Sequence, residues 1–217
     1  MNKNSILLPV SILLAGVLIA GSIIYSKVPK NAKPLTKSEL IAILEDDDFI
    51  LGSEDAPVSL VIFGDYQCPY CKLQYDQTEK KIIENYVNTG KVKMFYRDLP
   101  LRNIHPQAQL AAQATQCAGN QGKFWEYHDY LFDNQEAIPE LDFTVTAVTL
   151  GLSENEFQKC LESNETKLEV DTDAQHAFNY GLDATPMSLV NGTLVEGSQP
   201  YEVFVQVIEN ELANPVE

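Results

Sequence analysis

The chain opens with one long apolar segment that carries no charge. Residues 5–25 read SILLPVSILLAGVLIAGSIIY, about the length that an α-helix needs to cross the hydrocarbon core of a bilayer. Small residues at Ala20 and Ser22 leave room for a cleavage site, but the run exceeds the ~7–15 apolar residues of a signal-peptide core. We therefore expect residues 1–25 to form an uncleaved N-terminal signal anchor with one transmembrane helix, followed by a linker over residues 26–37.

Two apolar runs flank a helical pattern after this linker. Residues 58–63 are β-branched and continuously apolar, as in a central strand that is covered on both faces. Residues 70–87 carry apolar positions at helical spacing, and residues 92–99 alternate like a second strand. A strand, a crossover helix and a strand form a βαβ unit, so we expect the two strands to be parallel.

The periodicity then becomes helical over a long stretch. Five helical segments, separated by glycines, are expected near residues 105–118, 123–134, 143–150, 154–163 and 165–180. At the start of the fourth segment, Ser153 and Glu156 have the spacing of a capping box. This pattern predicts an all-helical insertion over about residues 103–183.

Strand character returns near the end of the chain. Asn191-Gly192 is the strongest hairpin signal in the sequence, and it joins apolar segments at residues 187–190 and 194–196. Residues 201–212 close the chain as an amphipathic helix. Together these elements predict one α/β domain over residues 38–217, into which the helical segment is inserted.

Charge narrows the range of partners for this domain. The chain has 31 Asp and Glu residues against 15 Lys and Arg residues, a net charge of −16 at pH 7. Residues 1–34 carry four lysines and no acid, so the rest of the chain is more negative still. A field of this sign disfavours nucleic acid and anionic membrane surfaces as partners of the domain.

The sequence Cys68-Pro69-Tyr70-Cys71 lies where the first strand leads into a helix. Proline suits the first helical position, and Cys71 follows one turn along on the same face as Cys68. The N–H groups and positive dipole end at the helix start favour a thiolate at Cys68. We therefore predict two catalytic cysteines, with Cys68 as the attacking thiol and Cys71 as the shielded thiol that resolves a mixed disulfide.

Zinc binding and an inert structural bridge are the alternatives for this cysteine pair. Zinc normally takes four ligands, and neither a second C-x-x-C nor a paired histidine cluster accompanies the first. We therefore expect no metal, and no cofactor other than the redox-active disulfide itself.

Several segments around the motif carry a family resemblance. They are residues 63–72 (FGDYQCPYCK), 97–101 (RDLPL) with His105-Pro106, the alanine-rich stretch ending at Cys117-Ala118, and residues 122–128 (GKFWEYH). In these segments the chain resembles the DsbA-like thiol-disulfide oxidoreductases of the thioredoxin superfamily, over roughly residues 50–213. The C-P-Y-C motif alone is shared with glutaredoxins. The resemblance implies a thioredoxin fold with an inserted all-helical domain.

The resemblance also implies a substrate-binding loop at Thr185-Pro186. In the family, a proline that follows a cis peptide bond packs beside the active-site cysteines and offers backbone groups to an extended peptide. An X-Pro bond between a helix and a strand is more often trans, so the cis form here rests on the resemblance.

The chain departs from the family pattern at residues that affect the pKa of the cysteines or proton transfer to them. Many relatives carry a buried acid six residues before the first cysteine, where this chain has Ile62. Asp65 is a candidate proton relay in its place, acting through water, with a solvated or capping acid as the alternative. Tyr70 cannot add the positive charge that a histidine between the cysteines supplies. We therefore expect a weaker oxidant than relatives with C-P-H-C, and a Cys68 pKa above about 4.

Cys117 and Cys160 form a second cysteine pair, within the predicted helical insertion. In a chain that leaves the cytoplasm, we expect them to form a structural disulfide. Two buried free thiols are the alternative.

These observations support three functional hypotheses. The first is a dithiol oxidase that introduces disulfides into unfolded or reduced exported polypeptides, and that a quinone-linked membrane oxidase, DsbB-like or vitamin K epoxide reductase-like, re-oxidises. The second is a reductase or isomerase of exported disulfides, and the third is a redox-inactive peptide-binding or chaperone module. The expected location is the cell membrane, with a single-pass anchor and the catalytic domain on the extracytoplasmic side.

Overall fold

The computed structural model of the chain describes residues 49–214. The predicted anchor at residues 1–25 and the linker at residues 26–37 lie outside the described residues. Among the helices of residues 49–214, none combines the length and the apolar character that a membrane span requires.

A four-stranded mixed sheet forms the centre of the domain, in the order β2-β1-β3-β4. β1 (Val58–Gly64) pairs in parallel with β2 (Val92–Asp98), as the βαβ pattern predicted. β3 (Met187–Val190) runs antiparallel to β1, and β4 (Thr193–Glu196) continues antiparallel as a hairpin. The sheet has the thioredoxin-like α/β arrangement that was expected from the sequence.

The helical stretch that follows the motif is continuous but not uniform. It begins as α3 (Pro69–Gln74) and proceeds through a π-helical turn η1 (Tyr75–Glu79), a short α4 (Lys80–Ile82) and a second π-helical turn η2 (Ile83–Val87). The predicted helix over residues 70–87 is therefore confirmed in extent, whereas its π-helical turns were not predicted.

Helices cover both faces of the sheet. On one face, Leu60 and Ile62 of β1 share a core with Ile82 and with Phe204 and Ile208 of α10 (Tyr201–Ala213). On the other face, alternate residues of the same strand pack against the inserted helix α9, which includes Ala174 and Ala177. The continuously apolar sequence of β1 reflects this burial on both sides.

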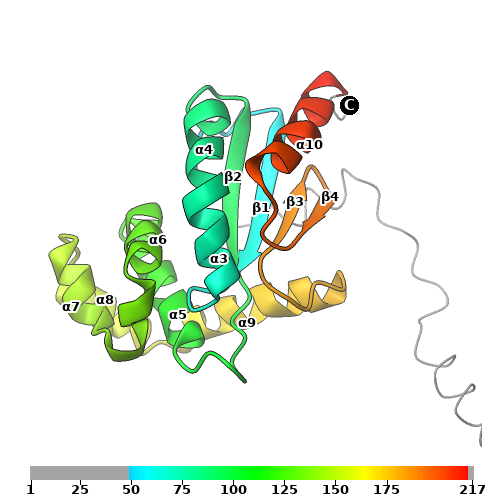
Figure 1. Cartoon of the computed structure of the whole chain (residues 1–217). Coiled ribbons are helices and arrows are strands. Elements are labelled where there is room, and N and C mark those ends of the chain that lie inside the picture. Colours follow the sequence, from blue (N-terminus) through cyan, green and yellow to red (C-terminus); the bar gives the residue numbers. More distant parts are fainter. Residues whose placement is uncertain (1–48, 215–217) are drawn as a thin grey trace, which may run out of the picture. The chain divides into compact units, whose positions relative to one another are not determined.

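The insertion between β2 and β3 consists of helices, as predicted. Its elements are α5 (Ala108–Gly119), α6 (Phe124–Asp133), the 3₁₀ helix η3 (Gln135–Glu140), α7 (Phe143–Thr149), α8 (Glu154–Leu161) and α9 (Asn164–Asn179). Figure 1 shows these helices grouped at the end of the sheet from which α3 starts. The insertion therefore lies beside the cysteine motif.

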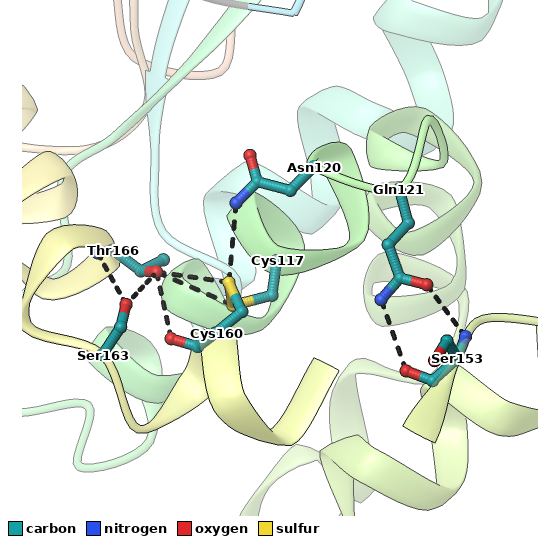
Figure 2. The surroundings of a disulfide bond; sticks show 7 residues. All are labelled: Cys117, Asn120, Gln121, Ser153, Cys160, Ser163 and Thr166. Atoms are coloured by element: carbon teal, nitrogen blue, oxygen red, sulfur yellow. Dashed lines mark hydrogen bonds between the residues drawn. A yellow bond between two sulfur atoms is a disulfide. The ribbon is translucent and has the colours of Figure 1, made fainter. Parts of the chain in front are cut away.

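The predicted capping box at the start of α8 is wrong. The side chain of Ser153 makes no capping hydrogen bond. The amide side chain of Gln121, from the turn after α5, contacts the backbone of Ser153 instead. Its Oε1 accepts the Ser153 N–H at 2.8 Å, and its Nε2 donates to the Ser153 carbonyl at 3.4 Å (Figure 2). A residue distant in sequence thus supplies the contact that a local pattern had suggested.

A disulfide joins Cys117 of α5 to Cys160 of α8, which confirms the second predicted cysteine pair. The Cα atoms are 5.6 Å apart, within the usual range for a disulfide. The Thr166 hydroxyl lies 3.3 Å from the Cys160 sulfur, and Asn120 Nδ2 lies 3.5 Å from the same atom (Figure 2). The bridge ties the first inserted helix to the fourth.

Candidate active site

Cys68 occupies the N-cap position of α3. Its backbone is extended (φ −73°, ψ 122°), and Pro69 takes the first helical position. The Cys68 N–H donates to the Asp65 carbonyl at 3.0 Å, while its own carbonyl accepts the first helical hydrogen bond, from Lys72 N–H, at 3.1 Å. The strand-to-helix junction thus fixes the backbone on both sides of the thiol, as the C-x-x-C spacing predicted.

The environment of Cys68 favours the thiolate. Cys68 and Cys71 are free thiols in this structure. The hydrogen bond from the Cys71 thiol is the largest of several effects that lower the pKa of Cys68 from 9.0 to about 6. Burial opposes this shift, while Thr185 and the backbone N–H groups of Cys71 and Tyr70 reinforce it. A pKa near 6 lies above 4, as the presence of Tyr70 led us to expect.

Cys71 has the opposite character. Its side chain is only 2% exposed, and burial, followed by the neighbouring Cys68, raises its pKa well above the usual value. The backbone N–H of Asp65 donates to the Cys71 sulfur at 3.4 Å. The two cysteines are thus chemically distinct, since one is ionised at neutral pH and the other stays a shielded thiol.

The loop between α9 and β3 completes the surroundings of Cys68. The Thr185-Pro186 peptide bond is cis, as the family resemblance implied. The Cys68 sulfur lies 3.5 Å from the Thr185 carbonyl oxygen, to which it donates while the thiol is protonated. Tyr70, between the cysteines, is 63% exposed. A reactive thiol, a cis-proline loop and an exposed aromatic side chain therefore meet at one end of the sheet.

Asp65 contacts the site through its backbone rather than its carboxylate. Its side chain is buried and accepts three hydrogen bonds, from Gln67 N–H at 2.7 Å, Leu101 N–H at 2.7 Å and His105 Nδ1 at 2.8 Å. The donors of Leu101 and His105 hold the loop after β2 against the end of β1. The geometry resembles the capping alternative, with the difference that the acid is buried instead of solvated.

A buried acid, Glu79, lies in the π-helical turn η1 and was not predicted as a site residue from the sequence. Burial is the main cause that raises the pKa of Glu79 to about 8. Gln74 Nε2 donates to Glu79 Oε1 at 3.2 Å and to Ser188 Oγ at 3.3 Å. Ser188 pairs with Ile62 across the sheet. The polar side chains near Ile62 therefore come from the helical stretch after the motif and from β3. A local sequence pattern could not reveal this arrangement.

Residues 49–214 contain no cluster of histidine, cysteine, aspartate or glutamate side chains suited to a metal ion.

Comparison with known proteins places this geometry in a family. The family model described as Thioredoxin matches residues 45–210. The "Probable disulfide bond formation protein D" of Bacillus cereus is 28% identical over 208 residues, which cover 92% of this chain and 93% of that protein. The Na(+)/H(+) antiporter NhaA 1 of Salinispora arenicola is 32% identical over 174 residues, which cover 80% of this chain but 26% of the antiporter. The chain spans about a quarter of the length of such antiporter relatives.

Solved structures show the same arrangement of sheet and inserted helices. Oxidised BdbD from Bacillus subtilis matches with a TM-score of 0.68 at 25% identity, covering 77% of this chain and 94% of that one. Alpha-DsbA1 from Wolbachia pipientis matches with a TM-score of 0.70 at 22% identity, covering 82% of this chain and 96% of that one. The chain therefore belongs to the thioredoxin family, and its inserted helical domain gives it the DsbA-like form of that fold.

Proposed function

We propose that the protein is a thiol-disulfide oxidoreductase that works as a dithiol oxidase on exported polypeptides. The observation that carries this proposal is the contrast between two buried cysteines at the start of α3: Cys68 at the N-cap, where its pKa is lowered to about 6, and Cys71 inside the first turn, where burial raises its pKa. A low thiolate pKa stabilises the reduced pair, which makes the corresponding disulfide a better oxidant. The Bacillus cereus relative, whose name refers to disulfide bond formation, supports the same direction.

The reaction follows from the positions of the two sulfurs. In the oxidised protein, a substrate thiolate attacks the sulfur of Cys68, and Cys71 leaves as a thiolate that takes up a proton. A second substrate thiolate then attacks the substrate sulfur of the mixed disulfide and releases the Cys68 thiolate. The substrate loses two electrons and gains a disulfide, while the cysteine pair is reduced. The first helical N–H groups, near Cys68, stabilise the departing thiolate.

The substrate would approach along the cis-proline loop. Pro186 cannot donate a backbone hydrogen bond, and the Thr185 carbonyl oxygen beside it lies 3.5 Å from the Cys68 sulfur. An extended peptide beside this loop would bring its own thiol to Cys68. The exposed Tyr70 ring adds an apolar surface for the same peptide.

The membrane setting belongs to the same proposal. The uncharged apolar run at residues 5–25 would anchor the protein as a single-pass helix, with the catalytic domain on the extracytoplasmic side. A quinone-linked membrane oxidase, DsbB-like or vitamin K epoxide reductase-like, would then restore the Cys68–Cys71 disulfide after each turnover.

Substitution of the catalytic cysteines tests the enzymatic role. We expect Cys68→Ser to abolish oxidation of a reduced two-cysteine peptide, because no sulfur remains to form the mixed disulfide. Cys71→Ser, given the same peptide in its disulfide form, should instead accumulate a mixed disulfide between Cys68 and the peptide, visible by mass spectrometry, because the Cys68 thiolate opens the peptide disulfide and no Cys71 thiol releases it. A Cys68→Ser protein that retains full function in cells would favour the redox-inactive chaperone hypothesis and refute the enzyme.

The direction of electron flow is read separately, by thiol trapping in cells. We expect the Cys68–Cys71 pair to be mostly oxidised at steady state. A pair that is mostly reduced would overturn the oxidase and identify a reductase or isomerase.

A further inference from the structure

Gln135 connects the helical insertion to the active-site turn. It is the first residue of η3, separated from the end of α6 by Asn134, and its side-chain amide points at the backbone that leads into α3. Nε2 donates to the Tyr66 carbonyl at 2.8 Å and to the Cys68 carbonyl at 3.0 Å. A single amide group thus binds two carbonyl groups that are two residues apart, on either side of Gln67.

These two carbonyls belong to the backbone turn that carries the Cys68 side chain. The Cys68 carbonyl already accepts the Lys72 N–H, and the Cys68 N–H is held by the Asp65 carbonyl. The turn sets the position of the Cys68 sulfur relative to the first N–H groups of α3, and those of Tyr70 and Cys71 contribute to the lowered pKa of Cys68. Carbonyl dipoles close to a thiolate repel it unless donors engage their oxygens. Gln135 supplies such donors.

We propose that Gln135 is a positioning residue of the disulfide-exchange site, which holds the turn at Tyr66 and Cys68 so that the Cys68 sulfur faces the first N–H groups of α3. The inference rests on the proposed function only in taking Cys68 as the reacting thiol. Gln135 would act through the backbone and would not touch the substrate sulfur. The helical insertion would thereby contribute to the reactivity of a cysteine that belongs to the thioredoxin fold.

The location of Gln135 allows it to be changed without disturbing the core. The residue is half-buried and lines an open cleft of about 370 Å³ together with Lys72 and Glu136. Methionine has nearly the same length and no hydrogen-bond donor, so Gln135→Met removes the two contacts and preserves the shape. Gln135→Ala removes the side chain altogether and serves as a second variant.

Gln121 offers a matched control within the same insertion. Its amide also binds the backbone of a distant segment, at Ser153, next to α8 (Figure 2). Gln121→Met therefore removes the same kind of contact without touching the turn before α3. Any effect common to both substitutions reflects general loss of stability, and only an effect specific to Gln135 supports positioning.

The measurement is the pKa of Cys68 in the reduced full-length protein, followed by thiolate absorbance near 240 nm across pH. We expect Gln135→Met and Gln135→Ala to raise this pKa by about 0.5 to 1, because the two lost hydrogen bonds act on the sulfur only through the backbone and only part of their effect reaches it. Gln121→Met should leave it unchanged. Thermal unfolding of each variant shows whether the fold is retained.

An unchanged or lowered Cys68 pKa in both Gln135 variants would overturn the inference, as would an equal rise in Gln121→Met. If Gln135→Ala does not fold, Gln135→Met provides the reading. Failure of the proposed function can be distinguished from failure of this inference. The proposed function fails if the wild-type protein does not oxidise the peptide, whereas the pKa of Cys68 is measured without any substrate.

Discussion

Joint replacement of Cys117 and Cys160 by alanine is expected to lower the free energy of unfolding by about 4 kcal/mol. The bridge connects residues that are 43 positions apart, and the chain-entropy model converts a loop of that length into roughly this value. The loss should be measured by urea denaturation of the double variant against the wild-type protein, with the slope of the transition compared as well.

Chemical reduction is a poor substitute for this experiment, because a reductant also keeps Cys68 and Cys71 reduced. The double alanine variant isolates the structural bridge. A Ser153→Ala protein is a useful control, since the Ser153 side chain makes no capping hydrogen bond and its loss should cost little. A double variant within about 1 kcal/mol of the wild type would show that the bridge contributes far less than the entropy model requires.

The second large effect is a contribution of Cys68 to the stability of the reduced protein that grows between pH 6 and pH 9. The pKa of Cys68 falls from 9.0 to about 6 on folding. Below pH 6 the thiol is protonated in both the folded and the unfolded state, so it contributes nothing. Above pH 9 it is ionised in both states, and its full contribution is present. Each pKa unit corresponds to about 1.4 kcal/mol, so the contribution of Cys68 across this window has an upper bound of about 4 kcal/mol, which solvent screening reduces.

The comparison of reduced wild-type protein with Cys68→Ser across pH measures this contribution directly. The unfolding free energy of the wild-type protein minus that of Cys68→Ser should increase as the pH rises from 6 to 9. On acidification the same difference should decrease and be lost as the pH falls through 6. Because the Cys71 thiol is the largest cause of the low pKa, Cys71→Ala should remove much of the slope. A difference that does not change with pH would contradict a depressed pKa at Cys68.

The elements that could be predicted from sequence are those whose signals are local. The Asn191-Gly192 hairpin formed as expected because both residues adopt positive φ angles, 45° and 82°, which this turn requires. The parallel β1–β2 pair followed from the apolar runs and the length of the intervening helix. The cysteine motif was located by the same reasoning, since its position depends on one strand and one helix start.

The features that sequence could not reveal depend on contacts between distant segments. Asp65 meets His105 across 40 residues, and Gln135 reaches Cys68 across 67. The capping box at Ser153 fitted a local rule, yet the amide of Gln121 had access to the same backbone group and formed the bond instead. Where several polar groups can satisfy one donor, the tertiary arrangement decides among them, and a periodic pattern carries no information about it.

The order in which the chain folds follows from where β3 lies in the sequence. The hydrogen bonds inside each inserted helix join residues that are close in sequence. By contrast, Ser59 N–H reaches Asn191 Oδ1 across 132 residues, and the Cys68 sulfur meets the Thr185 carbonyl across 117. Local contacts form faster because they close shorter loops. We therefore expect the insertion to be helical before β3 joins the sheet. The cysteine pair would then stand at the start of α3 without its cis-proline partner until β3 is in place.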